Sequence, residues 1–244
     1  MDNIIVTGAS RGLGLAISAR LAALGYRVIG VARRETGAFV EAAEHARSEG
    51  AGALHFRACD LADMAAIPSL VREIKREFGP IYGLVNNAGL GTGGLLATMP
   101  DPDIEALIRL NTLSPILMSK YVVRGMMEKK RGRIVNMASI IASTGYNALS
   151  VYGATKASLV GFTKSLSREV GRLGITVNAV APGFIDTEMT HELEGSERER
   201  VVARAALKRL AAPEDVAATV AFLMGEGGRN ITGAVLTVDA GATA

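Results

Sequence analysis

The hydrophobic pattern of this chain switches repeatedly between two periods. Short runs rich in β-branched residues, typical of buried strands, alternate with longer stretches in which apolar positions recur at helical spacing. Val216 and Val220, which follow the helix-start signal Pro213-Glu214-Asp215, illustrate the helical spacing. The predicted strands are residues 4–7, 27–31, 53–58, 83–86, 133–138, 176–181 and 234–238.

Alternation of strands and helices over the whole length predicts an α/β fold. Successive βαβ units should form one parallel, doubly wound, seven-stranded sheet of the Rossmann type, with helices on both faces. No Pro/Ser-rich linker or break in composition divides the chain. We therefore expect a single domain over residues 1–244, an ordinary size for an α/β domain.

One segment departs from the apolar pattern. Residues 187–208 are rich in Glu and Arg, whereas the segments on both sides are largely apolar. One interpretation is an exposed helix pair with many i,i+4 charge partners. The other is a mobile lid over a substrate pocket, because insertions after the carboxyl end of a strand lie where ligands bind in such sheets.

Composition narrows the class of protein. Hydrophobic residues make up 49% of the chain and charged residues 21%, which favours a large core over disorder. The net charge of +3 is too small and too dispersed to predict a nucleic-acid binder. The densest basic patch, Lys129-Lys130-Arg131-Gly132-Arg133, is typical of a solvated helix end with cations near the negative pole of the dipole.

Cysteine and histidine usage indicates a reducing compartment and no metal. Cys59 is the only cysteine, so no intrachain disulfide can form. The chain starts without a signal-peptide pattern and has no uninterrupted apolar span, and we expect a cytoplasmic protein. His45, His55 and His191 lack metal-ligand spacing, so we expect no catalytic metal.

A glycine-rich loop follows the first predicted strand directly. Gly8, Gly12 and Gly14 have the spacing G-x-x-x-G-x-G and lead into a predicted helix. Glycines permit a tight turn and close approach to a pyrophosphate, and the helix N-terminus offers free N–H groups. No G-K-[ST] follows, so the loop is not a P-loop. A dinucleotide site is favoured over a simple tight βα turn.

The end of the second predicted strand indicates which dinucleotide. An NAD site usually has an acidic residue here for the ribose 2′-hydroxyl. This strand instead ends in Arg33 and Arg34, with Glu35 only beyond them, and Arg11 lies within the glycine loop. Arginines favour a 2′-phosphate through charge-assisted hydrogen bonds, so NADP(H) is predicted. Any one of the three could instead be simply solvated.

Tyr152 and Lys156 lie four residues apart in a predicted helix and therefore share one face. A nearby ammonium favours the phenolate, which makes Tyr152 a candidate acid or base. By itself the pair is weak evidence, because Y-x-x-x-K occurs often by chance. A second feature is Pro115, which deprives the Asn111 carbonyl of its helical donor and predicts a kink there.

Taken together and in this order, these features resemble the short-chain dehydrogenase/reductase family over essentially the full chain. The resemblance rests on the glycine loop and on residues that follow the later strands. These further residues are Asp60, the run Asn86-Asn87-Ala88-Gly89, Asn111, Ser139, the Tyr152/Lys156 pair and Pro182-Gly183.

The resemblance implies a role for each matching residue. Tyr152 would protonate a carbonyl oxygen that Ser139 holds, and Lys156 would lower the tyrosine pKa and bind the ribose. The Asn111 carbonyl would hold a water molecule in a proton path from the lysine. Adenosine-side contacts would come from Asp60, Leu61, Asn87, Ala88 and Gly89, nicotinamide-side contacts from Pro182, Gly183, Ile185 and Thr187, and phosphate-side contacts from Gly8, Ser10, Arg11, Gly12, Leu13, Gly14, Arg33 and Arg34.

Within the family, several phrases resemble the 3-oxoacyl-[acyl-carrier-protein] reductases. They are residues 131–136, 174–178, 181–189 and 231–233. This resemblance implies NADPH-dependent reduction of a 3-oxoacyl thioester in fatty acid biosynthesis, and a homotetramer paired through helices around residues 111–129 and 152–172. Other ketones remain open as substrates (acetoacetyl-CoA, a sugar, a steroid or a xenobiotic), as does a catalytically silent cofactor-binding regulator.

The resemblance also implies docking of an acyl carrier protein. We expect basic residues beside the pocket, one of them just before the glycine of Gly174-Ile175-Thr176-Val177-Asn178. Leu173 stands there instead, with Arg172 one place earlier, while Lys129, Lys130 and Arg131 could supply the other contact.

Overall fold

The computed structural model describes residues 1–186 and 195–244, with the side chains of 195–198 left out. The described residues form a seven-stranded sheet in which every pairing is parallel, in the order β3-β2-β1-β4-β5-β6-β7. The strands are β1 Asn3–Thr7, β2 Arg27–Ala32, β3 Ala53–Ala58, β4 Ile81–Asn86, β5 Gly132–Met137, β6 Ile175–Pro182 and β7 Val235–Val238.

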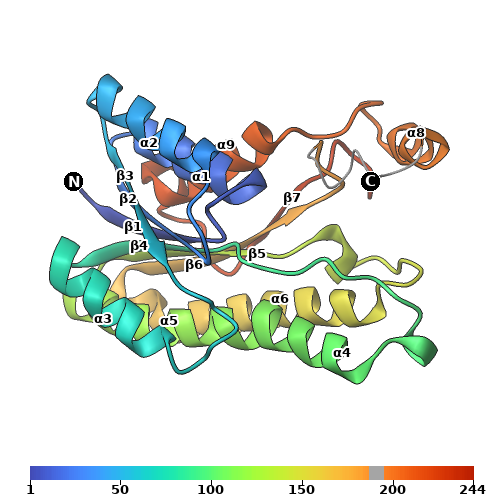
Figure 1. Cartoon of the computed structure of the whole chain (residues 1–244), viewed down its shortest axis with the longest axis horizontal. Coiled ribbons are helices and arrows are strands. Elements are labelled where there is room, and N and C mark those ends of the chain that lie inside the picture. The colour runs from blue at the N-terminus through green and yellow to red at the C-terminus, as the bar shows by residue number, and fades with distance from the viewer. Residues whose placement is uncertain (187–194) are drawn as a thin grey trace.

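Helices cover both faces of this sheet (Figure 1). On one face lie α1 (Gly12–Ala23), α2 (Gly37–Glu49) and α9 (Pro213–Met224). On the other lie α3 (Ile67–Phe78), α5 (Ser114–Lys129) and α6 (Ser150–Val170), with α4 (Asp101–Ile108) leading into α5. The predicted doubly wound α/β architecture is therefore confirmed.

The sheet separates two apolar cores, as expected where alternate side chains of a strand point to opposite faces. Along β1, Ile4 and Val6 pack with residues of α1 and α9, whereas Ile5 packs with residues of α3 and α5. All three side chains are fully buried. A parallel sheet buried on both faces explains why its strands appear in the sequence as continuous apolar runs.

Each predicted strand is present, with ends within two residues of the prediction. The largest difference is β4, which begins at Ile81 rather than at residue 83. Gly83, the predicted first residue, lies inside the strand, and a Cβ there would be 2.8 Å from Ile4 Cγ1. The glycine therefore serves close packing against β1 rather than ending the strand.

The kink predicted at Asn111 takes a different form. Residues Arg109–Leu113 make a π-helical turn between α4 and α5, and the Ser114 N–H donates to the Arg109 carbonyl five residues back. Pro115 then lies in the first turn of α5, where a missing N–H costs nothing. The helix accommodates the proline by a wider turn, a feature found often at functional sites.

The charged insertion is only partly described, because residues 187–194 lie outside the described residues. Its second part contains α8 (Gly195–Arg204) and then contacts the C-terminal segment, where the Leu207 N–H donates to the Ala240 carbonyl at 3.0 Å. Just before the insertion, the Asp186 N–H donates to the Ala211 carbonyl at 3.0 Å. The mobile lid over 187–208 remains a prediction. Within the described residues, no helix is both long and apolar enough to cross a membrane.

Candidate active site

The residues expected to bind and react follow the carboxyl ends of the strands. Because β1 pairs with both β2 and β4, the order of the strands reverses at β1, and a crevice opens beyond this point. Gly8, Arg33, Asn87 and Ser139 all lie in segments that leave this edge of the sheet. The topology thus brings the predicted cofactor-binding residues and the predicted catalytic residues to the same edge of the sheet.

The glycine loop needs glycine for two separate reasons. Gly8 has φ +68°, and Gly12 has φ +55°, a region of backbone space that disfavours other residues. Gly14 is required by space, since a Cβ there would lie 2.1 Å from the Gly8 carbonyl oxygen. Arg11 precedes α1 without a side-chain cap, so the first N–H groups of the helix face the crevice without an internal partner.

Thr7, which the sequence analysis did not single out, joins this loop to the end of β4. Its hydroxyl accepts hydrogen bonds from the N–H groups of Asn87 at 2.9 Å and Ala88 at 3.0 Å. The Asn87 side chain in turn donates to the carbonyls of Thr7 at 2.9 Å and Gly8 at 3.3 Å. A polar residue directly before a glycine loop was the available sequence signal.

The three arginines predicted to face a 2′-phosphate are exposed. Their segments meet through Thr36, whose hydroxyl donates to the Ser10 carbonyl at 2.6 Å and accepts from Phe39 N–H at the start of α2. Within the part of the chain that the structure describes, no carboxylate pairs with Arg11, Arg33 or Arg34. Their charge is thus available to an anionic ligand.

The other predicted cofactor contacts differ in whether their side chains or only their main chains could reach a ligand. Asp60 lies in the loop after β3, where its carboxylate accepts from the Ala62 N–H at 2.9 Å. Leu61 and Ile185 have side chains buried in the cores, so only their main chains could reach a ligand. Thr187 lies outside the described residues.

Gly183 follows β6 closely enough to Asp239 that a Cβ would come within 2.6 Å of the Asp239 Cβ. Its N–H donates to the Val238 carbonyl at 2.9 Å, so the β6 and β7 ends are joined there. Pro182 is the last residue of β6 and pairs in register with Val238. These residues therefore shape the edge of the crevice at the far side from the glycine loop.

Ser139 and Tyr152 come together from two elements. Ser139 follows β5 and caps the short helix Ile140–Ala142, accepting from the Ile141 N–H at 3.2 Å, and it also hydrogen-bonds the Tyr152 phenol. Tyr152 lies in the first turn of α6. Burial raises the pKa of the Tyr152 phenol above its usual 10.0, while the bond with Ser139 acts in the lowering direction.

Lys156 lies one turn further along α6 and is buried. Its Nζ donates to the Met137 carbonyl at 2.9 Å and lies 5.6 Å from the centroid of the Tyr152 ring. Burial lowers the pKa of this ammonium to about 8. The resemblance implied that Lys156 lowers the tyrosine pKa. In the structure the pKa of Tyr152 is raised, because burial of the phenol outweighs the lowering effect of Ser139.

The Asn111 side chain makes three hydrogen bonds to other described residues. Its Oδ1 accepts from the Leu90 N–H at 2.8 Å, and its Nδ2 donates to the Leu90 carbonyl at 2.9 Å and to Thr155 Oγ1 at 3.2 Å. The amide thereby connects the loop after β4 to α6. Gly89 lies beside it, since a Cβ there would be 3.1 Å from Asn111 Oδ1 and 3.6 Å from Lys156 Nζ.

The basic patch considered for carrier-protein docking does not lie beside this crevice. Lys129, Lys130 and Arg131 precede β5 and Arg172 precedes β6, whereas Ser139 follows β5. A strand of this length places the two ends about 20 Å apart. Arg131 is moreover paired with Asp2, with N–O distances of 2.8 and 2.9 Å. The expectation of basic residues beside the pocket of the same chain is therefore wrong for this patch.

Metal ligands are absent from the part of the chain that is described: no group of three or more His, Cys, Asp or Glu side chains there could hold an ion. The prediction of a reaction without a catalytic metal remains a prediction.

Comparison with known proteins assigns the chain to a family. Residues 8–243 match the family model described as "Enoyl-(Acyl carrier protein) reductase". The chain is 42% identical over 237 residues to the 3-oxoacyl-[acyl-carrier-protein] reductase FabG of Escherichia coli (strain K12), covering 97% of this chain and 95% of that protein. The Pseudomonas aeruginosa protein of the same name is 40% identical over 239 residues, with the same coverage.

Solved structures show the same fold at moderate identity. A short chain dehydrogenase from Burkholderia cenocepacia J2315 in complex with NADP has a TM-score of 0.90 and 35% identity, covering all of this chain and 98% of that one. A blue fluorescent protein from a metagenomic library, in complex with NADPH, has a TM-score of 0.92 and 34% identity at the same coverage.

Proposed function

Because this chain belongs to the short-chain dehydrogenase/reductase family, we propose that it is an NADPH-dependent ketone reductase. The favoured substrate is a 3-oxoacyl thioester on acyl carrier protein, reduced to the 3-hydroxyacyl form in fatty acid biosynthesis. The observation that carries the proposal is the convergence of Ser139, Tyr152 and Lys156 beyond the end of β5. We also propose a cytoplasmic location, as the sequence predicts.

The reacting side chains suit proton donation to oxygen. The Ser139 hydroxyl acts directly on the Tyr152 phenol, so the two hydroxyls are close enough to donate together to one substrate carbonyl oxygen. The raised pKa keeps the phenol protonated at neutral pH, which is the state that a proton donor requires. The nearby Lys156 ammonium then makes the resulting phenolate less costly. NADPH, when bound, supplies the hydride.

The residues present fit an NADP-type cofactor. The uncapped start of α1 and the close Gly8–Gly14 approach suit a pyrophosphate. Arg11, Arg33 and Arg34 are exposed and unpaired within the described residues, which suits a 2′-phosphate. The NADP and NADPH named for two similar structures support the same assignment.

Two reaction types are named among the proteins that this chain resembles. The family model names an enoyl reductase and the curated relatives name a 3-oxoacyl reductase. Reduction of a conjugated C=C bond also places negative charge on the thioester oxygen, as an enolate, so two hydroxyls converging on one oxygen suit either reaction. We favour the ketone because the curated relatives, which match 97% of this chain, are named 3-oxoacyl reductases. Acetoacetyl-CoA, sugars, steroids and xenobiotic ketones remain alternatives.

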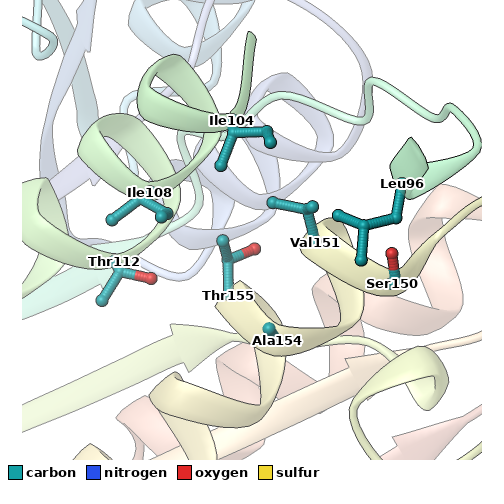
Figure 2. Close-up of a pocket in the computed structure, with 8 residues that line it drawn as sticks. All are labelled: Leu96, Ile104, Ile108, Thr112, Ser150, Val151, Ala154 and Thr155. Carbon is teal, nitrogen blue, oxygen red and sulfur yellow. The ribbon is translucent and has the colours of Figure 1, made fainter. Parts of the chain in front are cut away.

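We propose a homotetramer, supported by an apolar hollow outside the active site. A cavity of about 360 Å³ lies between α4 and the start of α6 (Figure 2). Its lining residues are Leu96, Ile104, Ile108, Thr112, Ser150, Val151, Ala154 and Thr155. Leu96 and Ile108 are 60% and 49% exposed. A second copy packed there would bury this surface, on the helices that the sequence predicts for pairing.

We also propose that an acyl carrier protein docks on this protein, but the basic patch constrains which active site it could serve. The patch of Lys129, Lys130, Arg131 and Arg172 lies at the opposite edge of the sheet from the crevice. If these residues bind an acidic carrier, they would do so for the active site of another subunit in the tetramer, not for their own.

The decisive test is steady-state NADPH consumption with acetoacetyl-CoA by the wild-type protein and by Tyr152→Phe. The variant keeps the ring and its packing but loses the proton donor. General acid catalysis contributes roughly 10²–10⁴-fold, so we expect kcat to fall by at least about 100-fold. NADPH binding, followed by fluorescence, should change little.

Two comparisons sharpen this assay. Crotonyl-CoA, an enoyl thioester, should not be reduced, and NADH should give a much lower kcat/KM than NADPH. A Tyr152→Phe variant as fast as wild type would show that the proton donor is misassigned. Reduction of crotonyl-CoA in preference to the ketone would replace the proposed reaction by enoyl reduction.

A further inference from the structure

Two asparagine side chains lie buried at the end of the central strands. Asn86 on β4 and Asn136 on β5 are paired in register, at the last pairing before the two strands separate into the site. Both are essentially fully buried, at 2% and 0% exposure. Their strands are otherwise largely apolar, and burying an amide is costly unless it is hydrogen-bonded. The pair therefore needs an explanation.

The two amides form a chain of hydrogen bonds across the interior. Asn86 Nδ2 donates to Asn136 Oδ1 at 2.8 Å and to Ser119 Oγ of α5 at 3.0 Å. Asn136 Nδ2 donates to Thr163 Oγ1 of α6 at 2.9 Å. The chain thus joins β4 and β5 to two of the helices on this face, α5 and α6. Asn86 Oδ1 has no partner among the described residues, so the amide is oriented by its donors.

These bonds lie next to those that hold the reacting groups. Thr163 is seven residues, two helical turns, after Lys156 and lies on the same face of α6. Met137, the next residue after Asn136, provides the carbonyl that binds Lys156 Nζ. The β5 end is therefore fastened to α6 at two successive points, through the Asn136–Thr163 bond and the Met137–Lys156 bond.

We propose that Asn136 and Thr163 are positioning residues, which set the register of β5 on α6 so that Ser139 reaches Tyr152 and Lys156 reaches Met137. Neither residue touches the reacting atoms. This inference rests on the proposed function for its effect on turnover. The spacing supports it: Ser139 lies three residues beyond Asn136, so a shift of the β5 end moves the hydroxyl that must meet the phenol.

The test is Thr163→Val, which has nearly the same shape as threonine but lacks the hydroxyl. A displacement near 1 Å at reacting groups can cost about 100-fold, and we expect kcat for acetoacetyl-CoA to fall by roughly 10- to 100-fold. KM for NADPH should stay within about twofold, because the glycine loop is untouched. Thr163→Ser keeps the hydroxyl and should restore most of the rate.

Asn3→Leu is the matched control for lost stability. Asn3 is equally buried and donates to the carbonyls of Phe78 at 2.8 Å and Pro80 at 2.9 Å, at the opposite edge of the sheet. This variant should lower the unfolding midpoint while leaving kcat close to wild type. If Thr163→Val keeps the wild-type kcat, or if Thr163→Ser fails to recover activity, the positioning role is refuted.

A second measurement does not depend on the reaction. The ionisation of Tyr152 can be followed by ultraviolet absorbance as the difference between each protein and its Tyr152→Phe counterpart. Loss of the Ser139 contact should move this titration to higher pH in Thr163→Val, because that hydrogen bond acts to lower the pKa. An unchanged titration would overturn the inference. A wild-type protein that reduces no ketone would instead overturn only the proposed function.

Discussion

At the scale of single residues, the burial of the Lys156 ammonium lowers the stability of the folded protein. Lys156 is 6% exposed, and its ammonium donates a hydrogen bond to the Met137 carbonyl at 2.9 Å. Burial lowers the pKa of the ammonium from 10.5 to about 8, so the folded protein holds this proton less tightly than the unfolded chain does. The buried ammonium thus reduces stability at neutral pH.

This cost predicts a pH dependence of stability. Below pH 8 both states carry the charge and the penalty is constant. Between pH 8 and 10.5 the unfolded state binds more protons, so the contribution of Lys156 to stability becomes more favourable as pH rises. Across this window, the unfolding free energy of wild type should rise relative to Lys156→Met, by up to about 3 kcal/mol.

Urea unfolding at several pH values between 7 and 10 measures this difference. Lys164→Met, an exposed lysine on the same helix, is the control and should show no such trend. A wild-type minus Lys156→Met difference that is flat over the window would mean that Lys156 is not desolvated as described.

At the scale of elements, the site depends on bonds between segments distant in sequence. Thr7 joins the end of β1 to the turn after β4, and Asn111 joins the turn after β4 to α6. Each bridge satisfies buried backbone or amide groups that no regular element could pair. The side chains of Thr7 and Asn111 therefore fix the glycine loop, the turn after β4 and α6 relative to one another.

Thr7→Val tests the first of these bridges. The change removes the only acceptor that the Ala88 N–H has among the described residues, whereas the Asn87 N–H keeps its second acceptor, the Val85 carbonyl at 3.1 Å. A buried donor left without a partner costs about 1–3 kcal/mol, and we expect the unfolding free energy to fall by at least about 1 kcal/mol. NADPH affinity should also fall, because Gly8 packs on Ala88.

Chemical denaturation and NADPH titration of Thr7→Val and Thr7→Ser give the comparison. The serine variant retains the hydroxyl and should remain close to wild type in both measurements. Equal losses in the two variants would assign the effect to packing of the threonine methyl group instead of to the bridge.

At the scale of the whole molecule, the single chain leaves an apolar surface around α4 and α6 exposed to solvent. Ile108 and Leu96 border the cavity between α4 and α6, and Val151 and Ala154 of α6 line it (Figure 2). Tyr152 and Lys156 belong to the same helix, so a second copy packed on this surface would also steady the reacting groups.

Ile108→Glu should therefore disrupt assembly. A carboxylate at a buried contact would be desolvated without a partner, and we expect light scattering after size-exclusion chromatography to show a smaller assembly than wild type. Leu24→Glu places the same change at a 50% exposed leucine at the end of α1 and should leave the mass unchanged. A wild-type mass retained by Ile108→Glu would place the interface elsewhere.

Much of this architecture was readable from short-range patterns. Each strand was predicted within two residues because a parallel sheet buried on both faces requires continuous apolar runs. Two details differed from the prediction. The predicted strand began at Gly83, which lies inside β4 with Ile4 packed over it, and a kink was expected where the chain makes a π-helical turn at Arg109–Leu113.

The sequence by itself determined the strand–helix alternation, the glycine loop, the arginines after β2 and the Tyr152/Lys156 pair, because these depend on spacing within one element or one turn. Tertiary structure alone decided the Asn86–Asn136–Thr163 chain, the Thr7 bridge, the direction of the Tyr152 pKa and the position of the basic patch. The physical reason is that burial and hydrogen bonding between distant segments arise only when the sheet order and register bring those segments together.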